Sequence, residues 1–510
     1  MALQLFAAVD IGSFELELSI FEAVSGKIRC VERQRHVIAL GSDTYQTGVI
    51  SHELLDELCD TLNHFVDTIR VYKIDMKNVS VYATSALREA KNRLLVEDRI
   101  RVSCGLKVTV LSNSEQRFMC YKAIPVWQKQ FDEIIEKESA IVDVGFGSMQ
   151  ISLYNKGALQ STQNLHLGAL RTWTMLNEVS ESGLNSRAIA EELIDYSINK
   201  FNNYYLQDKA IKNIIAIGDC MRIFAAKIMK LSQAESISAL DFINIYEQVL
   251  PLSPSTLAAK YDVPSEFAKL VIPVAMIYYR IIRVTGAKTL WIPVTSLSEG
   301  MATEWAQKQK LIKLDHDFNG DILSSARFLN KKYSGDRNHT EYIEDKCMLL
   351  FDATKKLHGL GKQEKLLLQL AAILHDCGKF VSITAPGQCA YDIIMASEIL
   401  GISHEERKIV ANIVKYNTMP FDLYDAQMGL PRDQWMTVYK LTALLRLANA
   451  LDRSHKQKIE NVQATLKGNR LIITALTDRD IELEAGLFHE KSRFFSEVYG
   501  VTPELKRKKL

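Results

Sequence analysis

The chain carries two short segments in which an apolar run ends in an aspartate that is followed by glycine and serine. Leu5–Val9 runs into Asp10–Ser13 (Asp-Ile-Gly-Ser), and Ser139–Val142 runs into Asp143–Ser148 (Asp-Val-Gly-Phe-Gly-Ser). Short apolar runs that stop at turn residues are typical of buried strands. The distance between the two copies is too long for a solenoid repeat. The pattern instead predicts two related α/β lobes that face each other across a cleft.

The residues at the ends of these strands suit a phosphate site. Glycines after a strand allow backbone N–H groups to approach phosphate oxygens, because no Cβ is in the way. A carboxylate at the strand end, Asp10 or Asp143, can hold Mg²⁺ directly or through water. A single Asp-x-Gly is often an ordinary β-turn. Two copies at comparable strand ends favour a phosphate-binding cleft.

Two charged residues are candidates for chemistry in such a cleft. Glu115 follows the expected strand Lys107–Leu111 at the start of a helix, where a carboxylate can activate water. The alternative is an acid that stabilises the helix N-terminus. Arg88 lies in a basic helical segment and can clamp a phosphate with two N–H groups. Its alternative is a solvated surface arginine.

Composition excludes several classes of protein. Hydrophobic residues make up 47% and charged residues 24% of the 510, as in folded globular chains, and a net charge of +1 gives no general attraction to nucleic acid or membrane. No apolar stretch reaches the ~18–20 residues of a membrane span. The N-terminal run has no basic region and predicts a strand, not a signal peptide. The eight cysteines form no Cys-x-x-Cys pair, which predicts reduced thiols and a cytoplasmic protein.

Changes of pattern along the chain predict four domains. Residues 1–122 and 123–305 are expected to form the two α/β lobes. Residues 306–455 are almost entirely helical in pattern, and residues 456–510 are expected to form a small α+β domain.

The motifs, taken in order, resemble the Ppx/GppA family of exopolyphosphatases and guanosine pentaphosphate phosphohydrolases. The resemblance extends over nearly the whole chain and includes a helical domain similar to the HD type. It implies two actin-like lobes of the ribonuclease H-like class, Mg²⁺ as cofactor and a homodimer. The segments that carry it are Asp10–Ser13, Ala83–Asn92 (Ala-Thr-Ser-Ala-Leu-Arg-Glu-Ala-Lys-Asn), Ser112–Glu115, Val142–Ser148, Leu167–Arg171 and Ser298–Gly300.

The resemblance also implies roles for individual residues. Arg88 would bind phosphate, and Glu115 would orient or deprotonate the attacking water. Asp10 and Asp143 would lie near Mg²⁺. The two phosphate loops would consist of Asp10, Gly12 and Ser13, and of Asp143, Gly145, Gly147 and Ser148.

Three segments depart from the family's usual pattern. Phe14 stands in the first loop where the family has Asn, and Phe146 introduces a bulky ring into the second loop. Gln150 replaces a glutamate. A later glycine-rich loop is altered to Gly218–Arg222 (Gly-Asp-Cys-Met-Arg). These changes bear on activity and substrate and not on the fold.

The first hypothesis for function is a Mg²⁺-dependent phosphohydrolase that removes terminal phosphate from polyphosphate or guanosine pentaphosphate. The alternative is a regulatory protein of the same fold that binds such a ligand but is catalytically weakened. A kinase of the same superfamily is less favoured, because Gly218–Arg222 lacks an adenosine-binding glycine pair. Neither nucleic acid nor a membrane is an expected partner.

A second group of residues belongs to the helical region. His339 followed by His375-Asp376 matches the metal-binding pattern of HD phosphohydrolases, and imidazole with carboxylate suits a hard or borderline divalent ion. Asn449 stands where the closing aspartate is expected, with Asp452 one turn away. We therefore expect a remnant of the metal site without a bound ion.

Overall fold

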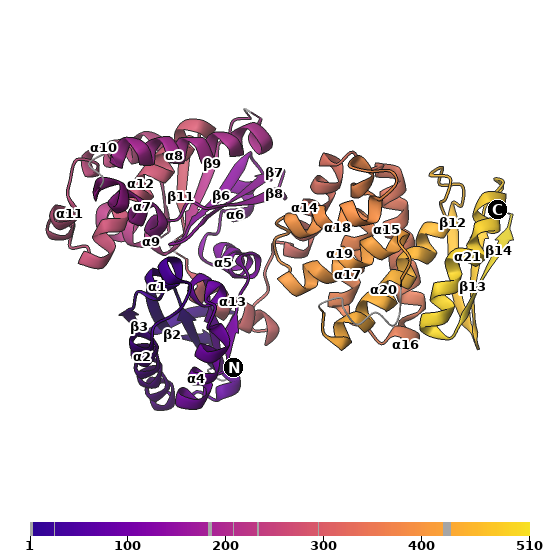
Figure 1. Ribbon diagram of the computed structural model, residues 1–510, viewed down its shortest axis with the longest axis horizontal. Coiled ribbons are helices and arrows are strands. Elements are labelled where there is room, and N and C mark those ends of the chain that lie inside the picture. Colours follow the sequence, from indigo (N-terminus) through magenta and orange to yellow (C-terminus); the bar gives the residue numbers. More distant parts are fainter. Residues whose placement is uncertain are drawn as a thin grey trace. The chain divides into compact units, whose positions relative to one another are not determined.

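The computed structural model describes residues 4–24, 26–181, 186–207, 209–231, 234–293, 295–421 and 430–509. The chain forms two compact units, Met1–Asp321 and Ile322–Leu510 (Figure 1). The first unit contains two α/β lobes, each built on its own sheet. The finer division at residues 122, 305 and 455 stays a prediction.

The first lobe is built on a five-stranded sheet in the order β3-β2-β1-β4-β5. Strands β1, β2 and β3 form an antiparallel meander, whereas β4 and β5 run parallel to β1. The parallel strands therefore end at the same edge, and that edge presents Asp10, Thr84 and the start of α5. The strands are β1 (Gln4–Ile11), β2 (Glu15–Val24), β3 (Lys27–Val37), β4 (Val79–Ala83) and β5 (Val108–Val110).

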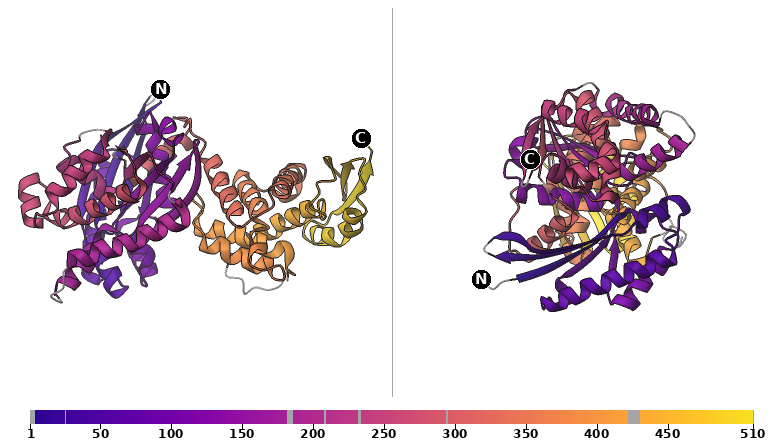
Figure 2. Two further views of the ribbon diagram at one scale, coloured as in Figure 1. Left: turned by 90° about the horizontal axis from the view of Figure 1, so that it is seen from above. Right: turned by 90° about the vertical axis from the view of Figure 1, so that its left-hand side faces the viewer.

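Helices cover both faces of this sheet. One face packs on α2 (His52–Val71), which lies along the indigo strands in Figure 2, and on α4 (Arg93–Cys104). The other face packs on α5 (Asn113–Trp127) and α13 (Leu297–Lys308). The predicted bound at residue 305 assigned α13 to the second lobe, but its buried residues lie in the core of the first. Shorter helices here are α1 (Leu40–Thr47), η1 (Met76–Asn78) and α3 (Ser85–Glu89).

The second lobe repeats the plan around a six-stranded sheet in the order β10-β11-β9-β6-β7-β8. Strands β6, β7 and β8 form an antiparallel meander, and β9 and β11 run parallel to β6. The second aspartate–glycine loop therefore follows β6 as the first follows β1. The strands are β6 (Ser139–Val144), β7 (Met149–Asn155), β8 (Ala158–Leu165), β9 (Asn213–Ile217), β10 (Glu235–Ser238) and β11 (Thr289–Ile292).

Helix α12 (Ser265–Thr285) is the central helix of the second lobe, with thirteen buried residues. It packs against α7, α8, α9, α10 and α11. The other helices of this lobe are α6 (Phe131–Ile135), α7 (Ala169–Glu181), α8 (Ser186–Phe201), η2 (Asn202–Leu206), α9 (Asp219–Ile223), η3 (Phe224–Ile228), α10 (Ala239–Val249) and α11 (Pro254–Tyr261).

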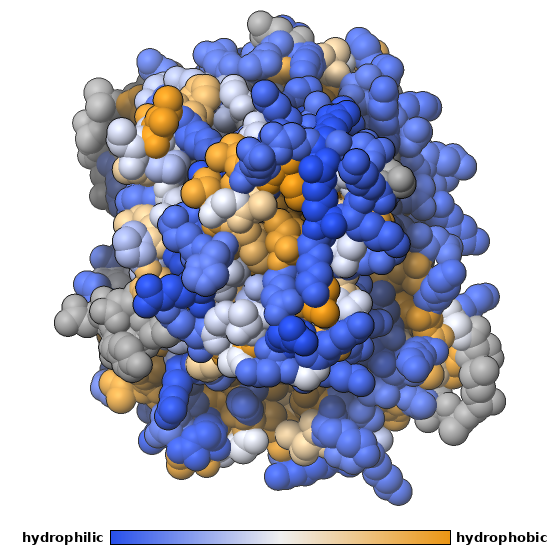
Figure 3. Space-filling view, turned by 90° about the vertical axis from the view of Figure 1, so that its right-hand side faces the viewer, coloured by the Kyte–Doolittle hydropathy of each residue, from blue (hydrophilic) through white to orange (hydrophobic). Residues whose placement is uncertain are grey.

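The second unit is helical and ends in a small three-stranded sheet in the order β12-β13-β14. Polar side chains predominate on the face drawn in Figure 3, with apolar groups between them, as on ordinary protein surfaces. Its elements, with α14 beginning in the first unit, are α14 (Phe318–Lys332), α15 (Arg337–Ala353), α16 (Lys355–His358), α17 (Lys362–Leu374), η4 (Cys377–Phe380), α18 (Pro386–Ala396), α19 (His404–Thr418), α20 (Arg432–Ala450), β12 (Asn461–Lys467), β13 (Arg470–Leu476), α21 (Glu482–Tyr499) and β14 (Thr502–Lys508).

Among the described residues, no helix combines the length and the apolar character needed to cross a bilayer.

Candidate active site

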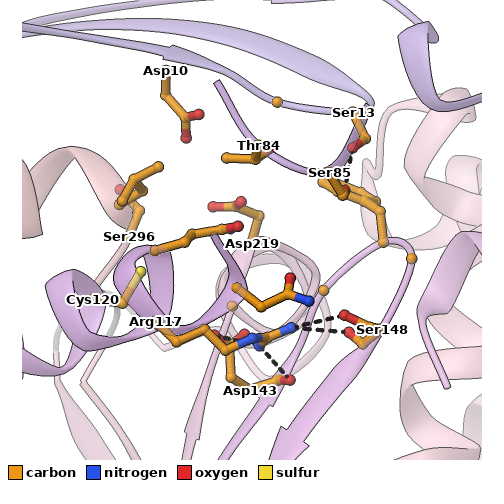
Figure 4. Close-up of a pocket in the computed structure, with 18 of the residues that line it drawn as sticks. Asp10, Ser13, Thr84, Ser85, Arg117, Cys120, Asp143, Ser148, Asp219 and Ser296 are labelled. Carbon is orange, nitrogen blue, oxygen red and sulfur yellow. Dashed lines mark hydrogen bonds and ion pairs between the residues drawn. The ribbon is translucent and has the colours of Figure 1, made fainter. Parts of the chain in front are cut away.

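A small cavity of about 60 Å³ lies between the two lobes, where the aspartate–glycine loops meet (Figure 4). Only ~10–15 Å³ of such a volume is needed to hold one water molecule, so the cavity has room for several. Its walls come from both loops, from the starts of α3 and α5, from the loop before α9 and from the segment before α13. The predicted residues that line it are Asp10, Gly12, Ser13, Arg88, Asp143, Gly145, Gly147 and Ser148.

The first loop is tied to the start of α3. The N–H of Gly12 donates to the carbonyl of Glu15 at 3.0 Å, which closes the turn. The hydroxyl oxygen of Ser13 accepts from the N–H of Ala86 at 3.1 Å and from the Tyr45 hydroxyl at 3.1 Å. Ser13 is buried. The loop therefore has a fixed shape, with the Ser13 hydroxyl held by protein donors.

The second loop is closed in the same way, by a bond of 2.9 Å from the N–H of Gly145 to the carbonyl of Ser148. A Cβ at Gly147 would lie 2.8 Å from the Tyr45 hydroxyl oxygen. A side chain at this position would have to displace the hydroxyl of Tyr45, which packs against the loop. The same tyrosine thus contacts both loops.

Asp143 is paired with Arg117, a residue of α5. The two side chains approach to 2.6 Å, and both are almost completely buried. Arg117 also donates to the Asp143 carbonyl at 3.0 Å and to the Ser148 hydroxyl at 3.1 Å. The carboxylate predicted to lie near Mg²⁺ is therefore already neutralised by a protein cation. Arg117 lies two positions after Glu115 in the sequence. No local pattern predicts its pairing with Asp143, which is 26 residues away.

Asp10 and Asp219 carry the acidic character of the cavity (Figure 4). Among the described residues, Oδ1 of Asp10 is buried and has no hydrogen-bond partner. Burial, with repulsion from Asp219 and Glu17, raises the pKa of Asp10 well above its usual value. Burial and the carboxylates of Glu15 and Glu17 raise the pKa of Asp219 to about 8. Asp219 accepts from Arg222 at 3.3 Å, so the unpartnered carboxylate oxygen of this pair is that of Asp10. Two carboxylates at one cavity fit a hard divalent cation such as Mg²⁺.

Glu115 is not among the residues that line the cavity, and its role as the base stays a prediction. Its carboxylate accepts the N–H of Ser112 at 3.0 Å, and the Ser112 hydroxyl accepts the N–H of Glu115 at 3.2 Å. This reciprocal capping box occupies the side chain at the helix N-terminus. The spacing Ser-x-x-Glu is the sequence signature of this box, and the contact agrees with the alternative role, an acid at the helix N-terminus.

The face of α5 that lines the cavity begins with Asn113 and Gln116. Positions 113, 116, 117 and 120 follow the spacing of three and four residues that defines one face of a helix. Glu115 is off this face by one position. In the first turns of the helix, the residues that line the cavity are therefore the amides Asn113 and Gln116, and not the carboxylate of Glu115.

Arg88 lines the cavity as predicted. Its guanidinium donates to the Leu111 carbonyl at 2.7 Å and to the Asn113 side chain at 2.6 Å. These bonds join the ends of α3 and β5 to the start of α5. Phosphate binding by Arg88 stays a prediction.

The substituted residues of the two loops have different surroundings. The ring of Phe14 lies 5.4 Å from that of Phe146 and 5.1 Å from that of Phe267, so it joins the core of the second lobe. Gln150 is completely buried and does not line the cavity, and neither polar atom of its side chain has a partner among the described residues.

A network of acids and arginines lies behind the first loop. Glu15 and Glu17 of β2 approach Arg35 of β3 and Arg222 of α9, at distances from 2.8 to 3.8 Å. Arg222 therefore links the second lobe to the first. Burial is the larger effect at Glu15 and raises its pKa to about 7, although Arg35 opposes it.

We expect Glu15→Gln to flatten the pH dependence of stability. Because the folded-state pKa of Glu15 is raised, its contribution is fully present below about pH 4.5 and is lost as the pH rises through about 7. The shift corresponds to a loss of about 3 kcal/mol in the wild type. Denaturant unfolding at pH 4.5 and pH 8 measures the free energy of unfolding of the wild type and of the variant. An equal change between the two pH values in both proteins would contradict the prediction.

The predicted metal-site residues of the second unit do meet. One ligand atom from each of His339, His375 and Asp376 lies within 4.8 Å of the others. The aspartate beside them is Asp452, which accepts from His339 at 2.8 Å, and not the residue at position 449.

Comparisons with known proteins agree with this architecture. The model of the Ppx/GppA phosphatase family matches residues 19–309, and that of Ppx/GppA phosphatase domain III matches residues 323–489. A guanosine-5'-triphosphate,3'-diphosphate pyrophosphatase of Photobacterium profundum is 20% identical over 493 residues, which cover 92% of this chain and 91% of that protein. A protein of the same name from Aeromonas hydrophila is 20% identical over 80% of each chain.

Two solved structures share the fold of the first unit. A Ppx/GppA family member from Aquifex aeolicus has 18% identity and a TM-score of 0.50, over 60% of this chain and 99% of that one. An exopolyphosphatase from Cytophaga hutchinsonii has 18% identity and a TM-score of 0.51, and the match covers 61% of this chain and 100% of that one. These likenesses confirm the expected α/β fold, which is shared with solved Ppx/GppA proteins.

Proposed function

The chain belongs to the Ppx/GppA phosphatase family, and on that premise we propose that its interlobe cavity binds the end of a phosphoanhydride chain through Mg²⁺ and hydrolyses it slowly or not at all. The observation that carries the proposal is Gln116, an amide on the face of α5 that lines the cavity. It corresponds to the alternative expected from the sequence, a binding protein that is catalytically weakened.

The charges around the cavity support a requirement for a cation. Asp10 and Asp219 would repel a phosphate group, whereas Arg117 is already paired with Asp143. Mg²⁺ held by Asp10 and Asp219 would supply the positive charge that draws phosphate oxygens into the site. Arg88 and the backbone of the two loops would orient the terminal phosphate.

Weak hydrolysis follows because the proposal leaves no carboxylate of the described part of the cavity to act as a base: Asp10 and Asp219 would hold Mg²⁺, and Asp143 is paired with Arg117. Attack by water on a terminal phosphate is helped by a group that orients the water and accepts its proton. The amide of Gln116 can orient water but cannot accept a proton. Asp143 is buried against Arg117, and Glu115 caps its helix. The ligand would therefore remain bound for long periods relative to its cleavage.

The choice between polyphosphate and guanosine pentaphosphate is part of the proposal. The relatives named above as guanosine-5'-triphosphate,3'-diphosphate pyrophosphatases favour the nucleotide. Both ligands end in a phosphoanhydride-linked phosphate, which is the group that the cavity is proposed to hold.

The test measures binding and phosphate release on the same preparation of the full chain. We expect polyphosphate and guanosine pentaphosphate to bind in Mg²⁺ and to be released by a chelator, with phosphate formation far below one turnover per minute. Binding should weaken as salt rises, because charge attraction is screened. Asp10→Asn should reduce the Mg²⁺-dependent part of binding. Rapid turnover by the wild type would overturn the proposal. Ligand binding that is unaffected by a chelator and by Asp10→Asn would overturn it as well.

Three further features stay predictions. We propose that the helical domain is of HD type, for which the meeting of His339, His375 and Asp376 is the support. A homodimer and a cytoplasmic location are implied by the family resemblance.

A further inference from the structure

The second loop gathers four oxygen atoms around a single cation, the guanidinium of Arg117 (Figure 4). Nη1 lies 2.6 Å from Oδ2 of Asp143 and donates to the carbonyl of the same residue at 3.0 Å. Nη2 donates to the carbonyl of Ser148 at 3.3 Å and to its hydroxyl at 3.1 Å. One side chain of α5 therefore contacts a carboxylate, two carbonyls and a hydroxyl that belong to β6 and the turn after it.

These four oxygen atoms form a set that hard divalent cations also use. Mg²⁺ and Ca²⁺ bind carboxylate and carbonyl oxygens, and Mg²⁺ keeps several of its own waters. The distances to Arg117 are those of N–H donors and are longer than the ~2.0–2.6 Å of metal–oxygen bonds. The oxygens are therefore spaced for a guanidinium, or for an ion that contacts part of the set through water.

The charge of the second loop is balanced by Arg117 alone. Asp143 is the only charged side chain from position 143 to 150. Its register partner on β7 is the completely buried, neutral Gln150. Arg117 and Asp143 are 5% and 8% exposed, so little solvent screens the pair. A second cation at Asp143 would be repelled by the guanidinium and would find no uncompensated charge on this loop.

We propose that Arg117 takes the place of a divalent cation at the second loop, so that Asp143 binds no ion in the wild type and gains a site for one when Arg117 is removed. The proposal departs from the Mg²⁺ near Asp143 that the family resemblance implies, and it goes beyond the function proposed for the cavity, which assigns Mg²⁺ to Asp10 and Asp219. A guanidinium supplies charge but does not lower the pKa of a bound water as a metal ion does.

The test is whether an ion can replace the missing side chain. Arg117→Ala removes the cation and opens space beside the four oxygens. The chelated full chain is unfolded by heat at increasing Mn²⁺ concentration, and free Mn²⁺ is measured by electron paramagnetic resonance to count bound ions. Without Mn²⁺ the variant should unfold at a lower temperature than the wild type. Added Mn²⁺ should restore much of that temperature, because the ion binds the folded state. The variant should bind one Mn²⁺ more per chain than the wild type.

Three variants serve as matched controls. Arg117→Met removes the same charge but fills the space with an apolar chain, so Mn²⁺ should not rescue it. Arg117→Ala combined with Asp143→Asn lacks the carboxylate that the ion needs and should also not be rescued. Arg117→Ala combined with Asp10→Asn keeps the oxygens of the second loop intact and should still be rescued. The last variant separates this site from the Mg²⁺ proposed at Asp10.

Rescue and the additional ion, confined to variants whose second loop is both open and charged, support the proposal. A folded Arg117→Ala variant that binds no more Mn²⁺ than the wild type overturns it, as does equal rescue of Arg117→Met. An Arg117→Ala variant that stays unfolded at every Mn²⁺ concentration also overturns it, because a bound ion should restore the missing charge. A wild type that loses one Mn²⁺ on Asp143→Asn does so too. No phosphate ligand is present in these measurements, so failure here is distinct from failure of the function proposed for the cavity.

Discussion

Replacing Gln116 by glutamate is expected to raise phosphate release by about 10²-fold, the lower end of what a general base contributes. The position already lines the cavity on the face of α5, so the new carboxylate would be placed where water meets the bound phosphate. It adds a proton acceptor without changing the length of the side chain. Phosphate formed from polyphosphate and from guanosine pentaphosphate in Mg²⁺, with binding measured in parallel, checks the result.

Two neighbouring substitutions are its controls. Glu115→Gln changes a carboxylate on the same helix, but this side chain caps the helix, so release should be unchanged apart from a small loss of stability. Gln150→Glu should give no gain, because the residue is buried away from the cavity and a charge there has no partner. An inactive Gln116→Glu that still binds ligand, or a Glu115→Gln variant that abolishes wild-type release, would contradict the assignment of the base position.

Removing the cation from the buried pair of the second loop should be strongly destabilising. Arg117→Met leaves Asp143 buried without its partner, and losses of this kind are about 3–5 kcal/mol. The variant also loses the bonds to the Asp143 carbonyl and the Ser148 hydroxyl. Denaturant unfolding followed by tryptophan fluorescence is suitable, because four of the five tryptophans lie in the first unit.

The double variant Arg117→Met with Asp143→Leu tests whether the cost comes from an uncompensated charge. Well-packed apolar groups often replace a buried ion pair at little cost, so the double variant should recover much of the lost stability. Equal losses in the single and double variants would show that Arg117 matters for packing and not for the charge of Asp143.

Local sequence patterns predicted the elements of the cleft well, because each depends on a few adjacent residues. The runs before Asp10 and Asp143 become β1 and β6, and both aspartates reach the same cavity. For Glu115 the sequence left two roles open, a base or an acid that stabilises the helix N-terminus. In the structure its carboxylate caps the helix, and its role as the base stays a prediction.

Other site residues could not be found from the sequence, because their roles depend on contacts between distant segments. Asp219 enters the cavity through α9, and its acidic partners Glu15 and Glu17 lie on a strand of the other lobe. The role of Asp452 depends on a hydrogen bond to a histidine on α15. The periodicity of a helix or a strand does not predict contacts between residues that lie so far apart in the sequence.

Phe14 makes a residue of the first loop part of the core of the second lobe. Its ring lies 5.4 Å from that of Phe146 and 5.1 Å from that of Phe267. Aromatic contacts of this kind contribute roughly 0.5–1.5 kcal/mol each. A movement that separated the two loops would break both contacts, so Phe14 couples the two lobes at the point where their loops meet.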